Sequence, residues 1–348
     1  MTAGALSAAQ PYNLGHISAL CARLELGAPS DKLTRVFGGF HHKMWRLNTR
    51  AGLYAVKQLC PDTDVQNPVT VRHYNSTESI AQAFSTQGIP AVHAIEYDSH
   101  YLHVMDNTGY LVYPWTNAVA LEKENITVEH ALEVARIMAR MHSADLAISE
   151  HRDAQYDIQP EDKLRALVEQ SIDQKVHKAR ELSEQLPSLF AIVANNKLAV
   201  PVLAQHRVIS HGDMDHKNVL WDTAGKALVI DWESARKLNP THEIILEALE
   251  WSGVTAEFDV TLFKNMLDAY SEAGGVLEPA SLEPSFHCVL GDWLNWLMYN
   301  LGRNIFLENG DPSALGATQV ELALSTILNL ERLIPSLLPI AQQQKRLA

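Results

Sequence analysis

The segment His211-Gly-Asp-Met-Asp-His-Lys-Asn218, followed by Val229-Ile-Asp-Trp-Glu233, decides the fold of this chain. It places one aspartate, Asp213, shortly before Asn218, and a second, Asp231, at the end of an apolar run. Phosphoryl transfer uses groups of this kind: one carboxylate accepts a hydroxyl proton, while an amide and another carboxylate hold magnesium on the nucleotide phosphates. The two motifs at this spacing are far more specific than either one alone.

Between the two motifs we expect a β-hairpin. Residues 218–221 predict a short strand, residues 222–225 a turn, and residues 226–230 a second strand. The hairpin would bring Asn218 and Asp231 to the same end of a small ribbon, close enough to share an ion. The alternative is a polar loop that lies in solvent.

These motifs together resemble the catalytic and metal-binding loops of the aminoglycoside phosphotransferase and choline kinase family, the small-molecule branch of the protein-kinase-like fold. Gly212 stands where protein kinases have arginine, and Asp231-Trp-Glu233 stands where they have Asp-Phe-Gly. The resemblance implies that Asp213 is the catalytic base and that Asn218 and Asp231 bind Mg²⁺. It also implies an α+β fold of two lobes, a small antiparallel-sheet N-terminal lobe and a mostly helical C-terminal lobe.

The N-terminal part contains the elements of a nucleotide pocket. Residues 44–48 and 53–59 alternate in polarity like adjacent antiparallel strands. Gly38 and Gly39 precede them and would let backbone approach phosphate closely, although most Gly-Gly pairs are ordinary turns. Lys57 is either a solvent-facing edge residue or the phosphate-binding lysine that kinases carry on their third strand. The resemblance favours the second interpretation.

A carboxylate partner for Lys57 is expected on the helix that follows. Residues 76–86 have apolar residues at helical spacing, and Glu78 lies in the first turns of this helix. Glu78 is therefore the candidate partner of Lys57. The alternative is that Glu78 only favours the helix N-terminus through the macrodipole.

The adenine-binding hinge is expected where residues 110–113 end in Tyr113-Pro-Trp-Thr116. In kinase-like hinges a backbone carbonyl and, two residues later, a backbone N–H bind the base. Pro114 has no N–H and fits the middle position if Tyr113 offers its carbonyl and Trp115 its N–H. The alternative is a simple strand end.

Length and composition are consistent with one catalytic unit, whose lobes we place at residues 1–116 and 117–348. No run approaches the roughly 20 apolar residues of a membrane helix, and the N-terminus lacks a signal-peptide pattern. Three scattered cysteines, Cys21, Cys60 and Cys288, fit reduced thiols of a cytoplasmic protein and no metal-ligand spacing.

Beyond the hinge the chain is expected to be helical except for the catalytic ribbon. Helices are predicted over residues 128–144, 161–186, 242–252 and 285–307, with His142 as a packed core residue. On the third helix, Glu243, Glu247 and Glu250 share one face, which is either solvated or an acidic wall for a cationic acceptor. Glu243 has a second interpretation, as a structural support of the catalytic loop.

Further acceptor contacts are expected from Glu233 and from the fourth helix. There Trp293, Trp296 and Tyr299 form an aromatic stripe, which is most simply core but whose edge can hold ammonium groups by cation–π attraction. Trp293 is the residue of this stripe that we assign to the acceptor site.

The net charge of −13 narrows the partners. A nucleic-acid binder needs a basic surface, and no basic patch or polybasic membrane segment is visible in the sequence. An acidic field favours small cations instead, such as aminoglycosides, other basic antibiotics or amino alcohols. Mg²⁺ and ATP or GTP complete the expected partners.

The predicted function is transfer of the terminal phosphoryl group of ATP or GTP to a hydroxyl of such an acceptor. A metabolic kinase for choline, ethanolamine, homoserine or a sugar is the alternative. A catalytically impaired regulatory module is disfavoured because Lys57, Asp213, Asn218 and Asp231 are all present. A protein kinase is disfavoured because the arginine before Asp213 and an Ala-Pro-Glu motif are missing.

Overall fold

A computed structural model of the chain divides into two compact units. The first comprises residues 1–119 and 221–233, and the second residues 120–220 and 234–348. The structure describes residues 12–37, 42–148, 151–154, 156, 159–176, 178–306 and 313–343. Gly38 and Gly39, the expected phosphate-binding glycines, lie outside the described residues, so their role stays a prediction.

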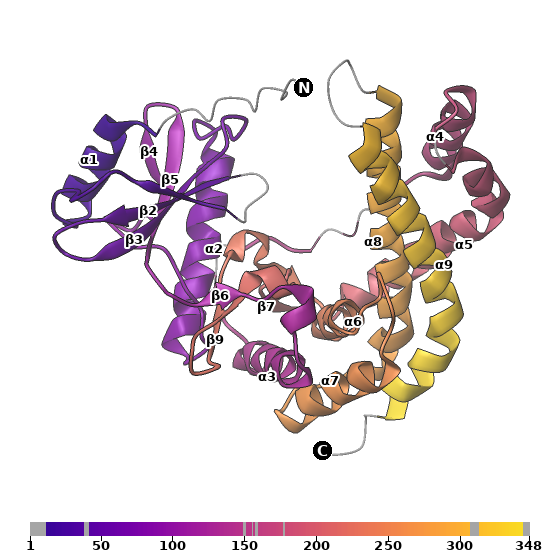
Figure 1. Ribbon diagram of the computed structural model, residues 1–348. Coiled ribbons are helices and arrows are strands. Elements are labelled where there is room, and N and C mark those ends of the chain that lie inside the picture. The colour runs from indigo at the N-terminus through magenta and orange to yellow at the C-terminus, as the bar shows by residue number, and fades with distance from the viewer. Residues whose placement is uncertain are drawn as a thin grey trace. The chain divides into compact units, whose positions relative to one another are not determined.

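The first unit is built on an antiparallel five-stranded sheet with the order β1-β2-β3-β5-β4 (Figure 1). Its strands are β1 (Thr34–Val36), β2 (Lys43–Asn48), β3 (Leu53–Gln58), β4 (His103–Met105) and β5 (Thr108–Pro114). In the register of the two central strands, Lys57 lies opposite Leu111. The two strands predicted around Lys57 are therefore β2 and β3.

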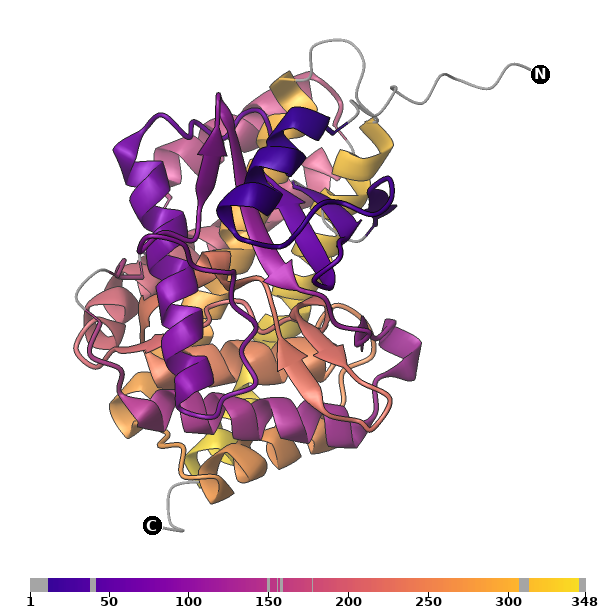
Figure 2. The ribbon, with the colours of Figure 1, turned by 90° about the vertical axis from the view of Figure 1, so that its left-hand side faces the viewer.

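Two helices, α1 (Leu14–Arg23) and α2 (Pro68–Thr86), flank this sheet (Figures 1 and 2). Tyr110 and Val112 of β5 belong to a buried cluster with α1, while Leu111 belongs to a separate cluster with α2. This alternation follows from the two-residue period of a strand, which sends successive side chains to opposite faces. The sheet is thus buried on both sides.

Helix α2 begins eight residues before the predicted start at residue 76. Asn67 caps it, accepting a hydrogen bond from the N–H of Val69, and Pro68 occupies the first helical position. Both are ordinary helix-start signals. The additional turns place Glu78 in the middle of the helix, where its side chain is buried.

The predicted hairpin forms from β8 (Val219–Trp221) and β9 (Ala227–Val229). The chain passes between the units within β6 (Val119–Ala120), within β8 and again after Glu233. Val229 exchanges backbone hydrogen bonds with Pro90 and Val92. Trp232 is fully buried and its ring lies 5.5 Å from that of Phe84 on α2. These contacts hold the metal motif on the first unit.

The second unit is mainly helical. Strands β7 (Val208–Ser210) and β10 (Arg236–Leu238) pair antiparallel beside the catalytic loop. The helices are α3 (Val128–Ala144), α4 (Glu161–Asp173), α5 (Ala179–Leu203), α6 (Pro240–Trp251), α7 (Val260–Glu272), α8 (Pro279–Phe306) and α9 (Ser313–Gln343).

The prediction of one helix over residues 161–186 is wrong, because two separate helices, α4 and α5, form there. Lys175 and Lys178 both have positive φ, which ends one helix and prevents it from continuing into the next. Helix α5 then packs against α8, and α8 against α9 (Figure 1). Helix α5 is long and apolar enough to cross a membrane. This is weak evidence, because the core helices of soluble proteins meet the same criterion.

The contact between α5 and α8 yields a stability prediction. A Cβ at Gly291 on α8 would overlap the side-chain amide of Asn196, which is buried on α5 and accepts a hydrogen bond from Cys288. We expect Gly291→Ala to lower the free energy of unfolding by about 1–3 kcal/mol, as overpacked sites do. Thermal or urea unfolding measures the change.

The matched control is Gly302→Ala on the same helix, where an added Cβ meets no atom of the described residues within 4 Å. Removing a helical glycine there should raise the free energy of unfolding by about 0.5–1 kcal/mol. Equal effects of the two substitutions would contradict the close α5–α8 packing.

Candidate active site

The catalytic loop joins β7 to a short 3-10 turn, His216–Asn218, in the second unit. The side-chain amide of Asn218 donates hydrogen bonds to the backbone oxygen and to Oδ2 of Asp213, both at 2.9 Å. Asp215 caps the turn by accepting from the N–H of Lys217. Asp213 is therefore held by the residue that the resemblance makes a metal ligand, and the Oδ1 atom of Asn218 is the oxygen that could meet a cation.

A glycine is required at position 212, both by the backbone conformation and by the neighbouring atoms of Ser234 and Arg236. Its φ is +79°, a value that residues with a side chain rarely adopt. A Cβ there would also overlap the guanidinium of Arg236 and the carbonyl of Ser234. The arginine that protein kinases carry at this position could not be accommodated in this backbone.

Two glutamates of α6 hold the backbone on either side of Asp213. Glu243 accepts a hydrogen bond from the N–H of Gly212 at 2.6 Å, and Glu247 accepts one from the N–H of Met214 at 2.8 Å. Their side chains are only 2% and 3% exposed. Both carboxyl groups are therefore used on the loop itself, which supports the structural interpretation of Glu243 and gives no exposed acidic wall on this face of α6.

The two glutamates have opposite electrostatic surroundings. Burial alone would raise the pKa of Glu243, but hydrogen bonds from His142, Ser210 and Gly212 outweigh it and lower the pKa to about 2. Burial and the nearby charges of Asp213 and Glu243 raise the pKa of Glu247 well above its ordinary value. Glu243 thus acts as a carboxylate, and the surroundings of Glu247 favour the neutral acid.

In the first unit, Lys57 is paired with the metal motif. Its Nζ lies 2.8 Å from Oδ1 of Asp231 and forms a second ion pair with Glu233. Burial opposes the charge of Lys57, yet the two carboxylates raise its pKa above the ordinary value. His42 also bonds Glu233, which keeps the pKa of that carboxyl at about 2 against the effect of burial. Glu233 is therefore a partner of Lys57 in this structure, and its predicted acceptor contact stays a prediction.

Glu78 is buried close by but is used differently from the prediction. Its carboxyl group accepts hydrogen bonds from the N–H of Ala94 (2.7 Å) and the hydroxyl of Tyr113 (2.6 Å). Burial raises its pKa to about 7, although the hydrogen bonds from Tyr113 and Ala94 and, to a smaller extent, the charge of Lys57 act in the opposite direction. The expected Lys57–Glu78 ion pair is not formed, since Lys57 is taken by the two acidic groups of the metal motif.

The predicted hinge register is wrong by one residue. The N–H of Trp115 donates to the carbonyl of Leu53 at 3.1 Å, and Tyr113 lies opposite Ala55 in the same ladder. Groups on an antiparallel strand point alternately to either side. The outward-facing groups available to a base are therefore the carbonyl of Pro114 and the N–H of Thr116.

Sequence and structure comparisons identify the family. A model of the phosphotransferase enzyme family matches residues 32–283. The chain belongs to the phosphotransferase enzyme family. No curated protein sequence matches it significantly. As the earlier resemblance implied, it has a kinase-like fold and is a phosphotransferase that acts on hydroxyl groups.

Several solved structures share this fold at low sequence identity. Spectinomycin phosphotransferase with ADP and spectinomycin has a TM-score of 0.66 and 13% identity, covering 93% of this chain and 100% of that one. Amicoumacin kinase with AMP-PNP, Ca²⁺ and Ami has 0.65 and 10%, covering 91% and 93%. A choline/ethanolamine kinase family protein from Mesorhizobium loti has 0.59 and 16%, covering 94% and 99%.

The residues present in this phosphotransferase fit a divalent cation and a nucleotide. Asp231 has the left-handed φ of 63°, an uncommon backbone conformation, and its side chain is 44% exposed. Its carboxylate and the amide oxygen of Asn218 are hard oxygen donors of the kind Mg²⁺ prefers. Lys57 carries a positive charge at a fixed position. Phosphate oxygens could replace the carboxylates of Asp231 and Glu233 as the partners of this charge.

The aromatic stripe of α8 is not core. Trp293 is half-buried, while Trp296 and Tyr299 are 40% and 56% exposed and stack on each other with ring centroids 5.5 Å apart. Nothing in the structure assigns Trp293 to a ligand, so its acceptor role stays a prediction.

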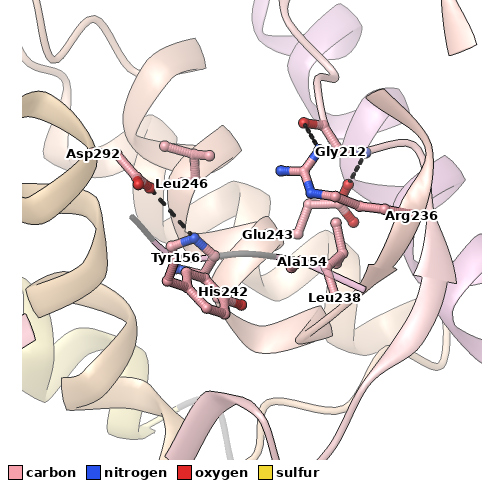
Figure 3. A pocket seen from close by; sticks show the side chains of 9 residues that line it. All are labelled: Ala154, Tyr156, Gly212, Arg236, Leu238, His242, Glu243, Leu246 and Asp292. Carbon is pink, nitrogen blue, oxygen red and sulfur yellow. Dashed lines mark hydrogen bonds and ion pairs between the residues drawn. The ribbon is translucent and has the colours of Figure 1, made fainter. Parts of the chain in front are cut away.

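A small cavity in the second unit adds residues that the sequence analysis missed. It is lined by Ala154, Tyr156, Gly212, Arg236, Leu238, His242, Glu243, Leu246 and Asp292 (Figure 3). For two of these residues the sequence contains a signal: Arg236 closely follows the metal motif, and Asp292 immediately precedes Trp293. Tyr156 lies in a segment with no recognisable motif.

The two loop-holding glutamates give a matched prediction. Glu243→Gln removes a buried negative charge that accepts hydrogen bonds, so turnover should fall and the free energy of unfolding should drop by about 1–3 kcal/mol. Glu247→Gln keeps a neutral acceptor for Met214 and should leave both nearly unchanged. Steady-state kinetics and chemical unfolding measure the two effects.

The pH dependence of the Glu243 effect has a defined sign. Because its folded pKa of about 2 lies below the ordinary value, Glu243 contributes stability above about pH 4.5 and loses it as the pH falls toward 2. The stability difference between wild type and Glu243→Gln should shrink over that range. If Glu247→Gln lowered the free energy of unfolding at neutral pH as much as Glu243→Gln does, Glu247 would also be ionised.

A double-mutant cycle tests the pairing of Lys57. In the nucleotide-free protein at pH 6, Lys57→Met and Glu233→Gln should be coupled by about 0.5–3 kcal/mol of unfolding free energy, as contacting charges are. Lys57→Met and Glu78→Gln should be additive to within about 0.5 kcal/mol, because Glu78 is mostly neutral below its pKa of about 7. Stronger coupling of Lys57 with Glu78 than with Glu233 would support the predicted Lys57–Glu78 ion pair instead.

Proposed function

We propose that this phosphotransferase transfers the γ-phosphoryl group of ATP, bound with Mg²⁺, to a hydroxyl group of a small amine-bearing molecule. The observation that carries the proposal is the held position of Asp213. Its backbone neighbours are fixed by Glu243 and Glu247, and its carboxylate is bonded by Asn218. A carboxylate positioned in this way is suited to accept the proton of an attacking hydroxyl.

The charge carriers of the first unit support the nucleotide part of the proposal. Lys57 is suited to bind phosphate oxygens, and Asp231 to hold the cation that neutralises developing charge on them. Pro114 and Thr116 offer a carbonyl and an N–H to the base. Structures of similar proteins contain ADP, or AMP-PNP with Ca²⁺, which is consistent with a nucleotide and a divalent cation.

An amine-bearing acceptor is supported by the net charge of −13, which attracts small cations over larger distances. The acceptors named for similar structures, spectinomycin and Ami, are small molecules too. A basic antibiotic is one class of acceptor. An amino alcohol, a hydroxylated amino acid or a sugar is the metabolic alternative, and a panel of such acceptors scored by nucleotide consumption separates them.

The catalytic assignment is tested by two substitutions in one loop. Asp213→Asn should lower turnover by roughly 10²–10⁴-fold, the usual scale for a positioned general base, while nucleotide affinity stays nearly constant. Asp215→Asn is the control, because asparagine caps a helical turn about as well as aspartate. It should leave turnover unchanged within experimental error.

Asp231→Ala provides the contrast to Asp213. It should weaken nucleotide binding in the presence of Mg²⁺ much more than in its absence, as isothermal calorimetry would show. Near-normal turnover of Asp213→Asn with its best acceptor would refute the assignment of the catalytic base.

A further inference from the structure

Arg46 lies on the same face of the first unit's sheet as Lys57. Residues that are directly opposite each other on antiparallel strands point to the same face. Arg46 of β2 is opposite Ala55 of β3, and Ala55 is opposite Tyr113 of β5. Ala55 and Lys57 are two residues apart on β3, so the period of the strand sends both side chains to one face. The four residues therefore share a surface.

The end of this face around Arg46 is accessible to solvent. The neighbours of Arg46 on β2, Trp45 and Leu47, point the other way and are buried in the cluster with α1. Leu111 lies on the same face as Arg46 but is buried in the cluster with α2. Arg46, in contrast, is exposed, and Ala55 beside it is partly exposed. A ligand can thus reach the small side chain of Ala55 and the guanidinium together.

An aromatic ring holds the Arg46 guanidinium in position. Its Cζ lies 5.1 Å from the ring centroid of Trp115, within the range of a cation–π contact. The backbone N–H of Trp115 donates to the carbonyl of Leu53 at 3.1 Å, and its Nε1 donates to Oδ1 of Asn117 at 3.0 Å. Among the described residues no carboxylate forms an ion pair with Arg46. These residues thus fix the guanidinium without neutralising its charge.

Trp115 also connects Arg46 to the hinge. It lies between Pro114 and Thr116, whose carbonyl and N–H point outward and are available to a base. A ring that bonds these two groups therefore lies next to the residue that Arg46 contacts. Lys57 lies further along the same face, two strand residues or roughly 7 Å away. The order along the sheet, base-binding groups and then a phosphate-binding lysine, matches the two ends of a nucleotide.

We propose that Arg46 binds the base of the nucleotide, with its guanidinium stacked on the ring and with Trp115 as the residue that positions it. This inference rests on the nucleotide binding of the proposed function. A guanidinium is planar, stacks on aromatic rings and attracts their electron-rich faces. The attraction is larger where water is excluded, so a base that covers Arg46 strengthens the contact. Such a residue recognises the aromatic base and not the phosphates.

Three probes separate the base from the phosphates: adenosine, ATP with Mg²⁺, and inorganic tripolyphosphate with Mg²⁺. Arg46→Gln keeps a planar polar group and removes the charge. It should weaken the binding of adenosine and of ATP by the same factor, roughly 3- to 30-fold, the scale of one cation–π contact. The affinity for tripolyphosphate should not change. Calorimetry on the full-length protein measures the three affinities.

Two further variants serve as controls. Arg50→Gln makes the same change in net charge at an exposed arginine in the turn between β2 and β3, and it should leave all three affinities unchanged. Lys57→Met should give the opposite pattern to Arg46→Gln, a loss of affinity for ATP and tripolyphosphate with adenosine binding retained. Because Arg46 is exposed, Arg46→Gln should leave the unfolding temperature nearly unchanged.

The positioning role of Trp115 is tested by combining substitutions. Trp115→Leu removes the ring and retains the backbone N–H that bonds Leu53. It should weaken adenosine binding by itself, and the double variant with Arg46→Gln should lose less affinity than the two single losses combined, because Trp115 acts through Arg46. Losses that simply multiply would overturn the positioning role.

Several results would overturn the base contact of Arg46. If Arg46→Gln lowered the affinity for tripolyphosphate as much as that for ATP, the arginine would be a phosphate ligand. If the affinity for adenosine did not change, or if Arg50→Gln lowered it equally, no stacking contact would exist. A wild-type protein that binds no adenosine would refute the contact as well.

The base contact and the catalytic function can fail separately. Phosphoryl transfer from ATP with unchanged nucleotide affinity in Arg46→Gln would refute the contact and leave the proposed function intact. Adenosine binding that depends on Arg46, in a protein that consumes no ATP with any acceptor of the panel, would support the contact and count against the proposed function.

Discussion

The carboxylate of Glu243 is the group on which the catalytic loop depends. It is buried, it remains ionised, and it accepts the backbone N–H of Gly212 and a bond from His142 at 2.6 Å each. His142 in turn bonds the hydroxyls of Tyr270 and Ser210. An isolated carboxylate in such a place would cost several kcal/mol, so this network is what permits its burial. Helices α3, α6 and α7 are thereby tied to one point of the loop.

The first unit meets a similar problem with the opposite sign. Lys57 is buried in a central strand and needs negative charge, which Asp231 and Glu233 supply. The pairing keeps lysine charged and the metal motif seated on the sheet without a ligand. Nucleotide phosphates and a divalent cation carry the same two kinds of charge, so they can exchange with this ion pair at little electrostatic cost. Glu78 is free to anchor Ala94 and Tyr113 instead.

The sequence allowed the fold and the core of the site to be predicted because those depend on local motifs. The spacing of Asp213, Asn218 and Asp231 and the strand pattern around Lys57 are local features. Partner choice is not local. Whether Lys57 pairs with Glu78 or Glu233 depends on which carboxylate lies close to its ammonium group once the helix has packed. The face of α6 that carries Glu243 and Glu247 has the same pattern whether it lies against solvent or against loop N–H groups, so helical periodicity could not distinguish the two.

The hinge register and the cavity beside Gly212 could not be predicted from the sequence for a related reason. The register of β5 against β3 is set by the whole sheet, and a shift of one residue exchanges the groups that point outward at Trp115 and Thr116. The cavity collects Tyr156, Arg236 and Asp292 from segments that no motif connects.

Gly212 links the catalytic loop to this cavity. Its N–H is held by Glu243, its carbonyl accepts from Arg236, and its missing side chain leaves the space that the guanidinium occupies. A bulkier residue would displace both the loop and the cation at once. The glycine before Asp213 therefore does more than permit a left-handed turn: it sets the catalytic carboxylate and the charge of the adjoining cavity in one backbone unit.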